Sequence, residues 1–408
     1  MKQRMMPLMR RLAAGLAAFT TAAAFAVCVS AEREDVVLDG SDSQQEENYL
    51  VSGDYKYSTL ISAENIERRA VQIEKYTGSA ENLEIPSELE GMPVVSLGEY
   101  AFVSANTLKT VTIPASVENL GTFAFADCVA LTDFYAADDN PLYKSKDGVL
   151  YNKDETVLHR YPVGRRPKEV TVEEGVEEIG NVAFTSCGYM ESLTLPSTLN
   201  YIGVSAFAEC VRLTSVKIPN KVKEIAAFAF NSCTNLVRAD LPVGLESIGN
   251  AAFAGTGLLD ITIPDTCVYI GQQAFAHTKL TSVTIPKSVI DIGLSAFGWT
   301  LNAESELAPD SSFIIRGYSG TAAQTYANDS EEGNNFKFVN LGASEKPAQT
   351  AAASEPEKTG MSTGRIIGIA VCGVLLAGIA AAAVISGVKS KQKKTQGNDN
   401  ADDDTEEE

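Results

Sequence analysis

Histidine, tryptophan and positive charge are all scarce in this sequence. The 408 residues include 2 His and 1 Trp, and 33 Lys and Arg stand against 53 Asp and Glu, for a net charge of −20. So few histidines leave little room for a His-based catalytic centre or zinc site. A phosphate backbone rewards clustered Lys and Arg, so the composition also argues against a nucleic-acid partner. The acidity belongs to the middle of the chain, because residues 32–364 alone carry −22.

Both ends of the chain contain an apolar segment. Residues 1–31 combine a basic start, an apolar run and small residues before Glu32, which predicts a cleaved secretory signal peptide. Cys28 follows the bulky Val27, which argues against a lipid anchor at that position. The segment 366–388 is apolar and carries no charge over its whole length, and four lysines follow it. The length and the basic flank predict a single membrane-spanning helix over 365–388, with the C-terminus in the cytoplasm and residues 32–364 outside the cell.

A short repeat of nearly constant period fills most of the remaining chain. An Ala-Phe pair marks each unit, with Phe at 102, 125, 184, 207, 230, 253, 275 and 297. Most pairs follow an Ile-Pro or Leu-Pro, as in LTSVKIPNKVKEIAAFAFNSC (Leu213–Cys233). A unit this short cannot bury its own apolar side, so the units must stack on one another. The repeat therefore predicts one continuous solenoid.

Each unit also predicts its own local structure. Val216 and Ile218 alternate with Ser215 and Lys217, which predicts a short strand with one buried face, and Pro219 ends its hydrogen-bond ladder. Stacked units would pair these strands in parallel. A later Gly is expected where the chain bends tightly, at positions Gly203, Gly249, Gly271 and Gly293.

These units resemble the repeat of the BspA-type leucine-rich repeat family, which reads approximately LxxIxIPxxVxxIGxxAFxxC. The likeness covers about residues 81–300. It implies a right-handed leucine-rich repeat solenoid with a parallel sheet on one face and short turns or 3-10 helices on the other. It also implies display on the surface of a bacterium, with a Gram-positive gut bacterium as the expected source, and binding of host or neighbouring-cell proteins, which includes adhesion for some members.

One long gap, between Phe125 and Phe184, interrupts the repeat. It contains DGVLYNKDETVLHRY (Asp147–Tyr161), which predicts a β-hairpin. We expect the chain to contain seven segments. The first three are a signal peptide at 1–31, an N-terminal segment with capping strands at 32–80, and the solenoid at 81–300 with its insert at about 129–166. The last four are a C-terminal cap of strand, short helix and strand at 301–342, a flexible stalk at 343–364, the membrane helix at 365–388 and a basic then acidic tail at 389–408.

The chain offers few candidates for chemistry. Four cysteines lie three residues after a repeat Phe, and the pattern favours buried structural thiols, with disulfides between stacked neighbours left open: Cys128, Cys187, Cys210 and Cys233. His159 and His277 lie in different units without a nucleophile at useful spacing. The acidic group Asp138, Asp139, Asn140 and Asp147 fits a calcium loop poorly. We therefore expect no catalytic residue, no metal and no cofactor.

The outward strand face is the expected site of recognition, although Ser and Thr also suit exposed strands that bind nothing. Its candidate residues are Thr110, Thr112, Ser192, Thr194, Ser215, Lys217, Arg238, Asp240, Asp260, Thr262, Ser282 and Thr284. The tyrosines of the insert, Tyr143, Tyr151 and Tyr161, are expected to project beside Arg238 and supply anchors. On that view the insert determines partner choice, and deleting residues 138–161 would abolish binding while leaving thermal unfolding largely unchanged.

The sequence therefore predicts a membrane-anchored surface protein that binds an extracellular protein, or a glycan, of a host or neighbouring cell. A receptor or scaffold that signals through a cytoplasmic partner is the alternative. A wall-active hydrolase would need a catalytic constellation, and the sequence contains none that we recognise.

Overall fold

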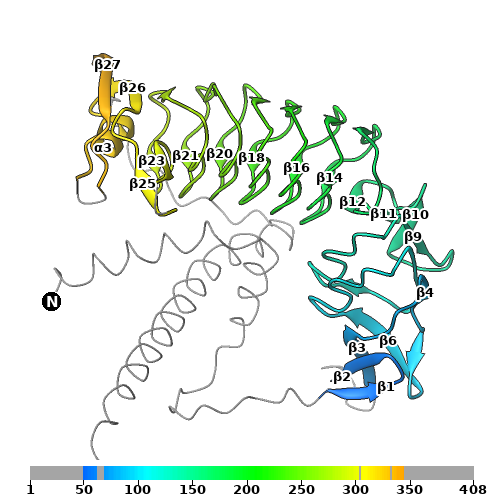
Figure 1. Cartoon of the computed structure of the whole chain (residues 1–408). Helices are drawn as coiled ribbons and strands as arrows, with labels where there is room; N and C mark the ends of the chain where they lie inside the picture. Colours follow the sequence, from blue (N-terminus) through cyan, green and yellow to red (C-terminus); the bar gives the residue numbers. More distant parts are fainter. Residues whose placement is uncertain (1–48, 62–68, 303–304, 331–332, 344–408) are drawn as a thin grey trace, which may run out of the picture. The chain divides into compact units, whose positions relative to one another are not determined.

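The computed structural model describes residues 49–61, 69–302, 305–330 and 333–343 (Figure 1). The chain divides into two compact units, and nearly all described residues belong to the one that comprises Asp42–Thr300 and Pro309–Glu357. Strands β24 (Trp299–Leu301) and β25 (Leu307–Pro309) fall at the boundary with the other unit. Across the described part of the chain, no helix is both long and apolar enough to cross a membrane, and the predicted signal peptide, stalk, membrane helix and tail lie outside that part.

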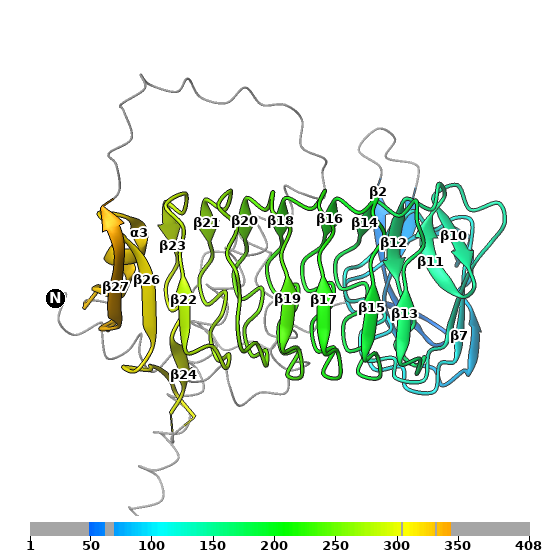
Figure 2. The ribbon, with the colours of Figure 1, turned by 90° about the horizontal axis from the view of Figure 1, so that it is seen from above.

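The predicted solenoid is confirmed: about 12 turns, spaced about 23 residues apart, are stacked through parallel sheets. On one side, the strands that contain the alternating pattern form three sheets, and Figure 2 shows several of these strands in one row. The first sheet is β4 (Asn82–Glu84), β7 (Thr110–Ile113) and β9 (Asp133–Ala136). The second is β13 (Glu169–Thr171), β15 (Ser192–Thr194), β17 (Ser215–Lys217) and β19 (Arg238–Asp240). The third is β22 (Ser282–Thr284), β26 (Ile314–Ser319) and β27 (Lys337–Ala343).

A second side of the stack contains a nine-stranded sheet that the sequence did not predict, and the predicted short turns follow its strands, as at residues 204–209. Each repeat contributes two residues to it, and an inward column of isoleucines runs through consecutive turns, for example Ile202, Ile225 and Ile248. Its strands are β10 (Tyr143–Lys146), β11 (Val149–Asn152), β12 (Val157–Arg160), β14 (Glu178–Ile179), β16 (Tyr201–Ile202), β18 (Glu224–Ile225), β20 (Ser247–Ile248), β21 (Tyr269–Ile270) and β23 (Asp291–Ile292).

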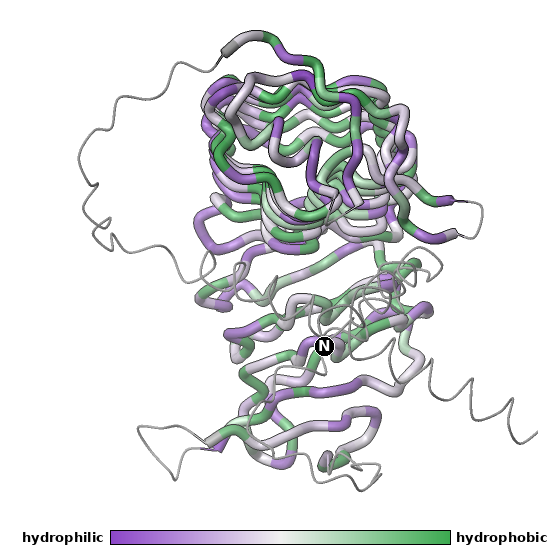
Figure 3. Tube along the Cα trace, turned by 90° about the vertical axis from the view of Figure 1, so that its left-hand side faces the viewer, coloured by the Kyte–Doolittle hydropathy of each residue, from purple (hydrophilic) through white to green (hydrophobic). Residues whose placement is uncertain are grey.

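The repeat phenylalanines form a column of stacked rings in the core. From Phe184 to Phe297, neighbouring ring centroids lie 4.8–5.3 Å apart. Burying each ring contributes about 2–3 kcal/mol, and ring pairing adds about 1 kcal/mol. Residues of like hydropathy consequently recur at the same places in successive turns (Figure 3). This column is the physical reason for the Ala-Phe period.

The backbone around each Phe is also repetitive. The residue two positions after most repeat phenylalanines has a positive φ, as at Ser232 (58°) and Gly255 (69°). The repeat glycines serve a different purpose from the tight bend that the sequence suggested. A Cβ at Gly249 would lie 2.6 Å from the amide nitrogen of Ala227, and one at Gly203 would lie 2.6 Å from that of Asn181. Close approach of stacked backbones, and not a left-handed conformation, is what requires glycine there.

The insert divides the core in two. Strand β11 places Leu150 in a cluster with the residues that precede it, whereas Val149 and Tyr151 join the cluster of the later repeats. Arg160, at the end of β12, joins the two parts, because its Nη1 donates to the carbonyl oxygen of Asn181 (2.8 Å) and its Nη2 to that of Gly121 (3.3 Å). The predicted insert is therefore an internal part of the stack.

Both ends of the stack have additional elements. The first sheet of the chain consists of β1 (Leu50–Ser52), β2 (Tyr55–Ile61), β3 (Arg69–Tyr76), β6 (Met92–Leu97) and β5 (Glu88–Leu89), and β8 (Asn119–Leu120) also pairs with β6. At the other end, helix α3 (Ala322–Ala327) lies between β26 and β27 in the chain. Tyr326 of α3 meets Phe297 edge-on, with ring centroids 6.4 Å apart, and terminates the aromatic column.

Candidate functional site

The outward positions of β13, β15, β17 and β19 form two straight rows. Glu169, Ser192, Ser215 and Arg238 are partners in register along the sheet. A second row includes Thr171, Thr194, Lys217 and Asp240. Because the residues between these rows point into the core, both rows face outward, and most of their members are exposed. The sheet therefore presents polar side chains on a backbone that is fixed from turn to turn.

Arg238 is held in place by its own strand. Its Nε lies 2.8 Å from one carboxylate oxygen of Asp240 and its Nη2 lies 3.0 Å from the other. This two-point bond raises the pKa of Arg238 and lowers that of Asp240, and both side chains remain exposed. Arg238 is thus a pre-oriented charge and would contact a partner together with Asp240.

Asp260 and Thr262 lie in an extended segment that no strand pairing joins to β19 in the described sheets. Both residues are exposed on either side of the buried Ile261, so they face outward as predicted, but the paired ladder expected through them ends at β19. Two causes are visible: the repeat is shorter here than in the preceding turns, and the Asp260 carboxylate accepts the backbone N–H of Ile261 (2.8 Å). Ser282 and Thr284 belong instead to a separate sheet, beside Ile314 and Arg316 of β26.

The sheet of β4, β7 and β9 contains the remaining predicted pair and a residue that the sequence pattern did not single out. Thr110 and Thr112 of β7 are paired with Asp133 and Tyr135 of β9. Tyr135 is 48% exposed, so it offers aromatic surface on the outward strand side. The alternation in Asp133–Ala136, with Phe134 buried, was the available signal. This alternation is hard to recognise in the sequence because the strand lacks the Ile-Pro that marks most units.

The three tyrosines of the insert do not project from the surface, so this part of the prediction was wrong. Tyr143 and Tyr151 are 8% and 7% exposed, and burial raises the pKa of Tyr151 to about 12. Tyr161 is partly buried and its ring stacks on Phe184 with centroids 4.8 Å apart, so it takes the place of a repeat Phe. The hairpin uses its aromatic side chains to join the two halves of the core.

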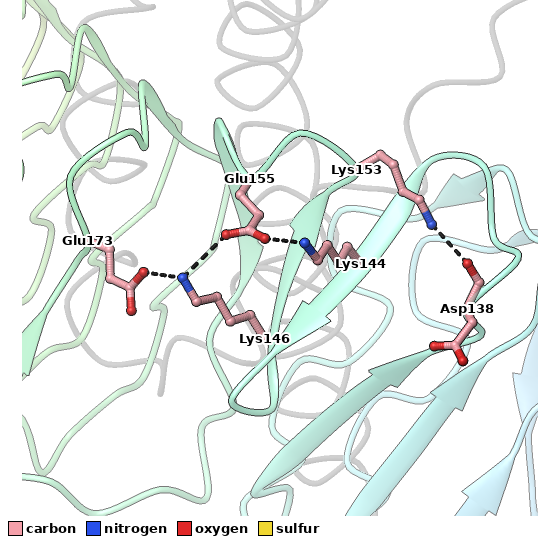
Figure 4. Close-up of polar contacts among 6 residues, drawn as sticks. All are labelled: Asp138, Lys144, Lys146, Lys153, Glu155 and Glu173. Atoms are coloured by element: carbon pink, nitrogen blue, oxygen red, sulfur yellow. Dashed lines mark hydrogen bonds and ion pairs between the residues drawn. The ribbon is translucent and has the colours of Figure 1, made fainter.

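The outer surface of the insert is a network of charges, drawn in Figure 4. The Glu155 carboxylate pairs with Lys144 and, at 3.3 Å, with Lys146, and Lys146 also pairs with Glu173. These contacts lower the pKa of Glu155 and raise that of Lys146. Lys153 donates to the backbone carbonyl oxygen of Asp138 at 3.0 Å. The network links the hairpin to the next turn and leaves its cations already paired.

The cysteines are buried thiols, as the sequence favoured. Cys128, Cys187, Cys210, Cys233 and Cys267 are all free, which leaves no disulfide within the described residues. The Cys233 thiol donates to the carbonyl oxygen of Phe207 in the preceding turn (3.1 Å). Burial raises the pKa of Cys187 to about 12. These thiols are suited to packing and not to nucleophilic chemistry.

The acidic loop and the two histidines lie in different surroundings. Within the described residues, no group of three or more His, Cys, Asp or Glu is arranged to hold a metal ion. Asn140 is fully buried and its side chain bonds to backbone groups, whereas Asp138 and Asp139 are exposed. His159 meets Tyr143 edge-on, with ring centroids 5.3 Å apart, and His277 is exposed elsewhere in the stack.

Comparisons with known proteins give the same repeat type. The family model described as BspA type leucine-rich repeat region matches six copies over residues 72–152 and 177–304. No curated protein matches the chain. A leucine-rich repeat protein from Bacteroides ovatus is 21% identical, with 72% of this chain and 78% of that chain covered and a TM-score of 0.40. A leucine-rich cell surface protein from Faecalibacterium prausnitzii is 22% identical, with coverages of 66% and 70% and a TM-score of 0.33. The pneumococcal vaccine antigen PcpA is 21% identical, with coverages of 64% and 67% and a TM-score of 0.38.

Proposed function

Because the chain belongs to the BspA-type leucine-rich repeat family, we propose that it is a cell-surface protein that binds extracellular protein partners, including those of host or neighbouring cells in adhesion. In this proposal residues 365–388 anchor it in the membrane and residues 343–364 hold the solenoid away from the bilayer. The uncharged run at 366–388 and the lysines after it support the anchor.

One observation carries the binding role: the outward rows of β13, β15, β17 and β19 are exposed and in register. A rigid, hydrogen-bonded sheet loses little entropy when a partner binds, so its side chains can contribute their full contact energy. Tyr135 adds aromatic surface to the neighbouring sheet. Residues of this type supply much of the energy in protein interfaces.

The test compares two variants of the full chain. Ser192→Arg with Ser215→Arg places two large side chains on adjacent strands of the outward row. Asn200→Arg places one at an exposed position beside the nine-stranded sheet. We expect the purified wild-type chain to retain a protein from extracts of host or neighbouring cells. The double variant should lose it and Asn200→Arg should keep it. Equal retention by all three proteins would contradict binding through this row.

A further inference from the structure

The corner that leads into the outward strands has an unusual composition for this acidic chain. Arg166, Tyr189 and Arg212 occupy equivalent positions of three consecutive turns, each one repeat period after the last. The Arg166 guanidinium lies 4.8 Å from the centroid of the Tyr189 ring. Such a stack fixes the direction of the guanidinium and leaves its donors available.

Apolar side chains are exposed on the same corner. Val211 is 39% exposed and lies above Gly188, at which a Cβ would be 3.6 Å from its Cγ2. Val237 and Leu259 are 43% and 62% exposed, and they lie on adjacent turns because the amide of Leu259 donates to the carbonyl oxygen of Val237 (3.4 Å). Single exposed apolar residues need no explanation, but exposed apolar residues beside arginines give a surface of the kind that protein partners cover.

Positive charge on this corner exceeds the negative charge available to neutralise it. The Glu191 carboxylate serves two cations, Arg212 at 2.7 Å and Lys168 at 3.4 Å. In the part of the chain that the structure describes, Arg166 belongs to no ion pair. Lys217, on the adjoining strand, lies beside its register partner Asp240 and, after Arg238, helps to lower the pKa of that carboxylate, so it adds no unpaired charge to the corner. The whole chain carries −20. A local excess of cations attracts an acidic partner to this corner, because the acidic surface elsewhere on the chain repels such a partner.

We propose that this corner docks an acidic segment of a partner protein that also carries apolar side chains. The docking residues are Arg166, Tyr189, Val211, Arg212, Val237 and Leu259. The inference rests on the proposed function and names the class of partner. A pure polyanion would use the arginines and leave the three aliphatic side chains in water. A peptide with Leu or Phe between acidic residues would cover both kinds of surface, which is why we favour a protein segment.

The test measures binding of fluorescein-labelled synthetic peptides to the purified full chain by anisotropy. The probe is a short synthetic peptide that alternates Asp or Glu with Leu or Phe, and polyglutamate and polyphosphate are compared with it. We expect saturable binding of the acidic, apolar peptide that weakens as salt is added. Arg166→Glu with Arg212→Glu should weaken it by about tenfold or more, and so should Leu259→Asp, since one anchor is commonly worth about 1.4 kcal/mol or more.

The control is Lys287→Glu, because Lys287 also lies over a tyrosine ring, that of Tyr318, at 4.6 Å. It should change the affinity by less than about twofold. The inference is wrong if no peptide saturates, if polyglutamate or polyphosphate binds as tightly as the apolar acidic peptide, or if Lys287→Glu is as damaging as the corner variant. If the corner variant retains the captured partner and Ser192→Arg with Ser215→Arg loses it, only the corner assignment fails and the proposed function stands.

Discussion

Asn140 joins the insert to the turn before it: its side-chain nitrogen donates to the carbonyl oxygen of Pro114 at 2.7 Å. The side-chain oxygen of Asn140, Oδ1, accepts the backbone N–H groups of Leu142 (2.9 Å) and Tyr143 (2.8 Å). Asn140 is fully buried, and its bonds to the carbonyl oxygen of Val117 (3.3 Å) and the amide of Tyr143 are buried as well, so these two backbone groups would lose their partner if the side chain were removed. A residue that belongs to an acidic loop in the sequence is, in the structure, a polar link in the core.

We therefore expect Asn140→Ala to lower the free energy of unfolding by about 2–4 kcal/mol, because two buried backbone groups lose their partner together. Urea denaturation of the full chain measures this loss. Asp139→Ala, at the exposed neighbouring position, is the matched control and should stay within about 0.5 kcal/mol of wild type. A similar small change for Asn140→Ala would show that the link contributes nothing to stability.

A second prediction concerns pH and His159. Burial, followed by the nearby charge of Arg160, lowers the pKa of His159 from 6.5 to about 4. The unfolded chain binds this proton at a higher pH than the folded chain, so the stabilisation is complete above pH 6.5 and declines as pH falls from 6.5 towards 4. At pH 4.5 the loss should be about 2 kcal/mol.

Carboxylates also titrate in this range, so the measurement is a difference between two proteins. Denaturant unfolding at pH 7 and pH 4.5 should show wild type losing about 2 kcal/mol more than His159→Gln. Identical losses in both proteins would mean that His159 takes up its proton as readily in the folded chain as in the unfolded one.

A third prediction follows from the buried thiols. At pH 8 the thiols of Cys187 and Cys210 should resist iodoacetamide in the native chain, because burial raises their pKa and withholds the reactive thiolate. In urea they should react at once. Mass spectrometry of tryptic peptides separates these sites from Cys28 and Cys372, which lie outside the described residues. Rapid native labelling of Cys187 or Cys210 would contradict the packing.

The sequence was sufficient to predict the solenoid, because one large aromatic residue per unit and its fixed period determine the stack. It was insufficient for the insert. Tyr161 lies one repeat period before Phe184, but it is a Tyr without an Ala before it, so a search for Ala-Phe pairs does not find it. In β11, Leu150 and its neighbour Tyr151 are both buried, in opposite clusters. A strand that is covered on both faces shows no alternation, and its orientation depends on partners distant in the sequence.

This placement also reverses the expectation for a deletion of residues 138–161. The segment supplies Asn140, Leu150 and Leu158 to the interior, and all three are almost fully buried. Its removal would expose both core clusters. Loss of binding in that deletion would therefore report unfolding, so point changes on exposed residues are the sound way to map a partner.

A final prediction uses the left-handed residue that lies two positions after most repeat phenylalanines. Gly255 has a φ of 69°, and the nearest atom to a Cβ there would be the Ser232 Cα at an ordinary 3.5 Å, so Gly255→Ala tests backbone strain without a clash. We expect it to lower the free energy of unfolding by about 1 kcal/mol. His277 occupies the equivalent place with a φ of 54° and is exposed. His277→Gly should relieve the same strain, although glycine's greater freedom in the unfolded chain reduces the gain to about 0.5 kcal/mol. Urea denaturation should show a lower free energy of unfolding for Gly255→Ala and a higher one for His277→Gly. A stabilising Gly255→Ala would show that these positions are not strained.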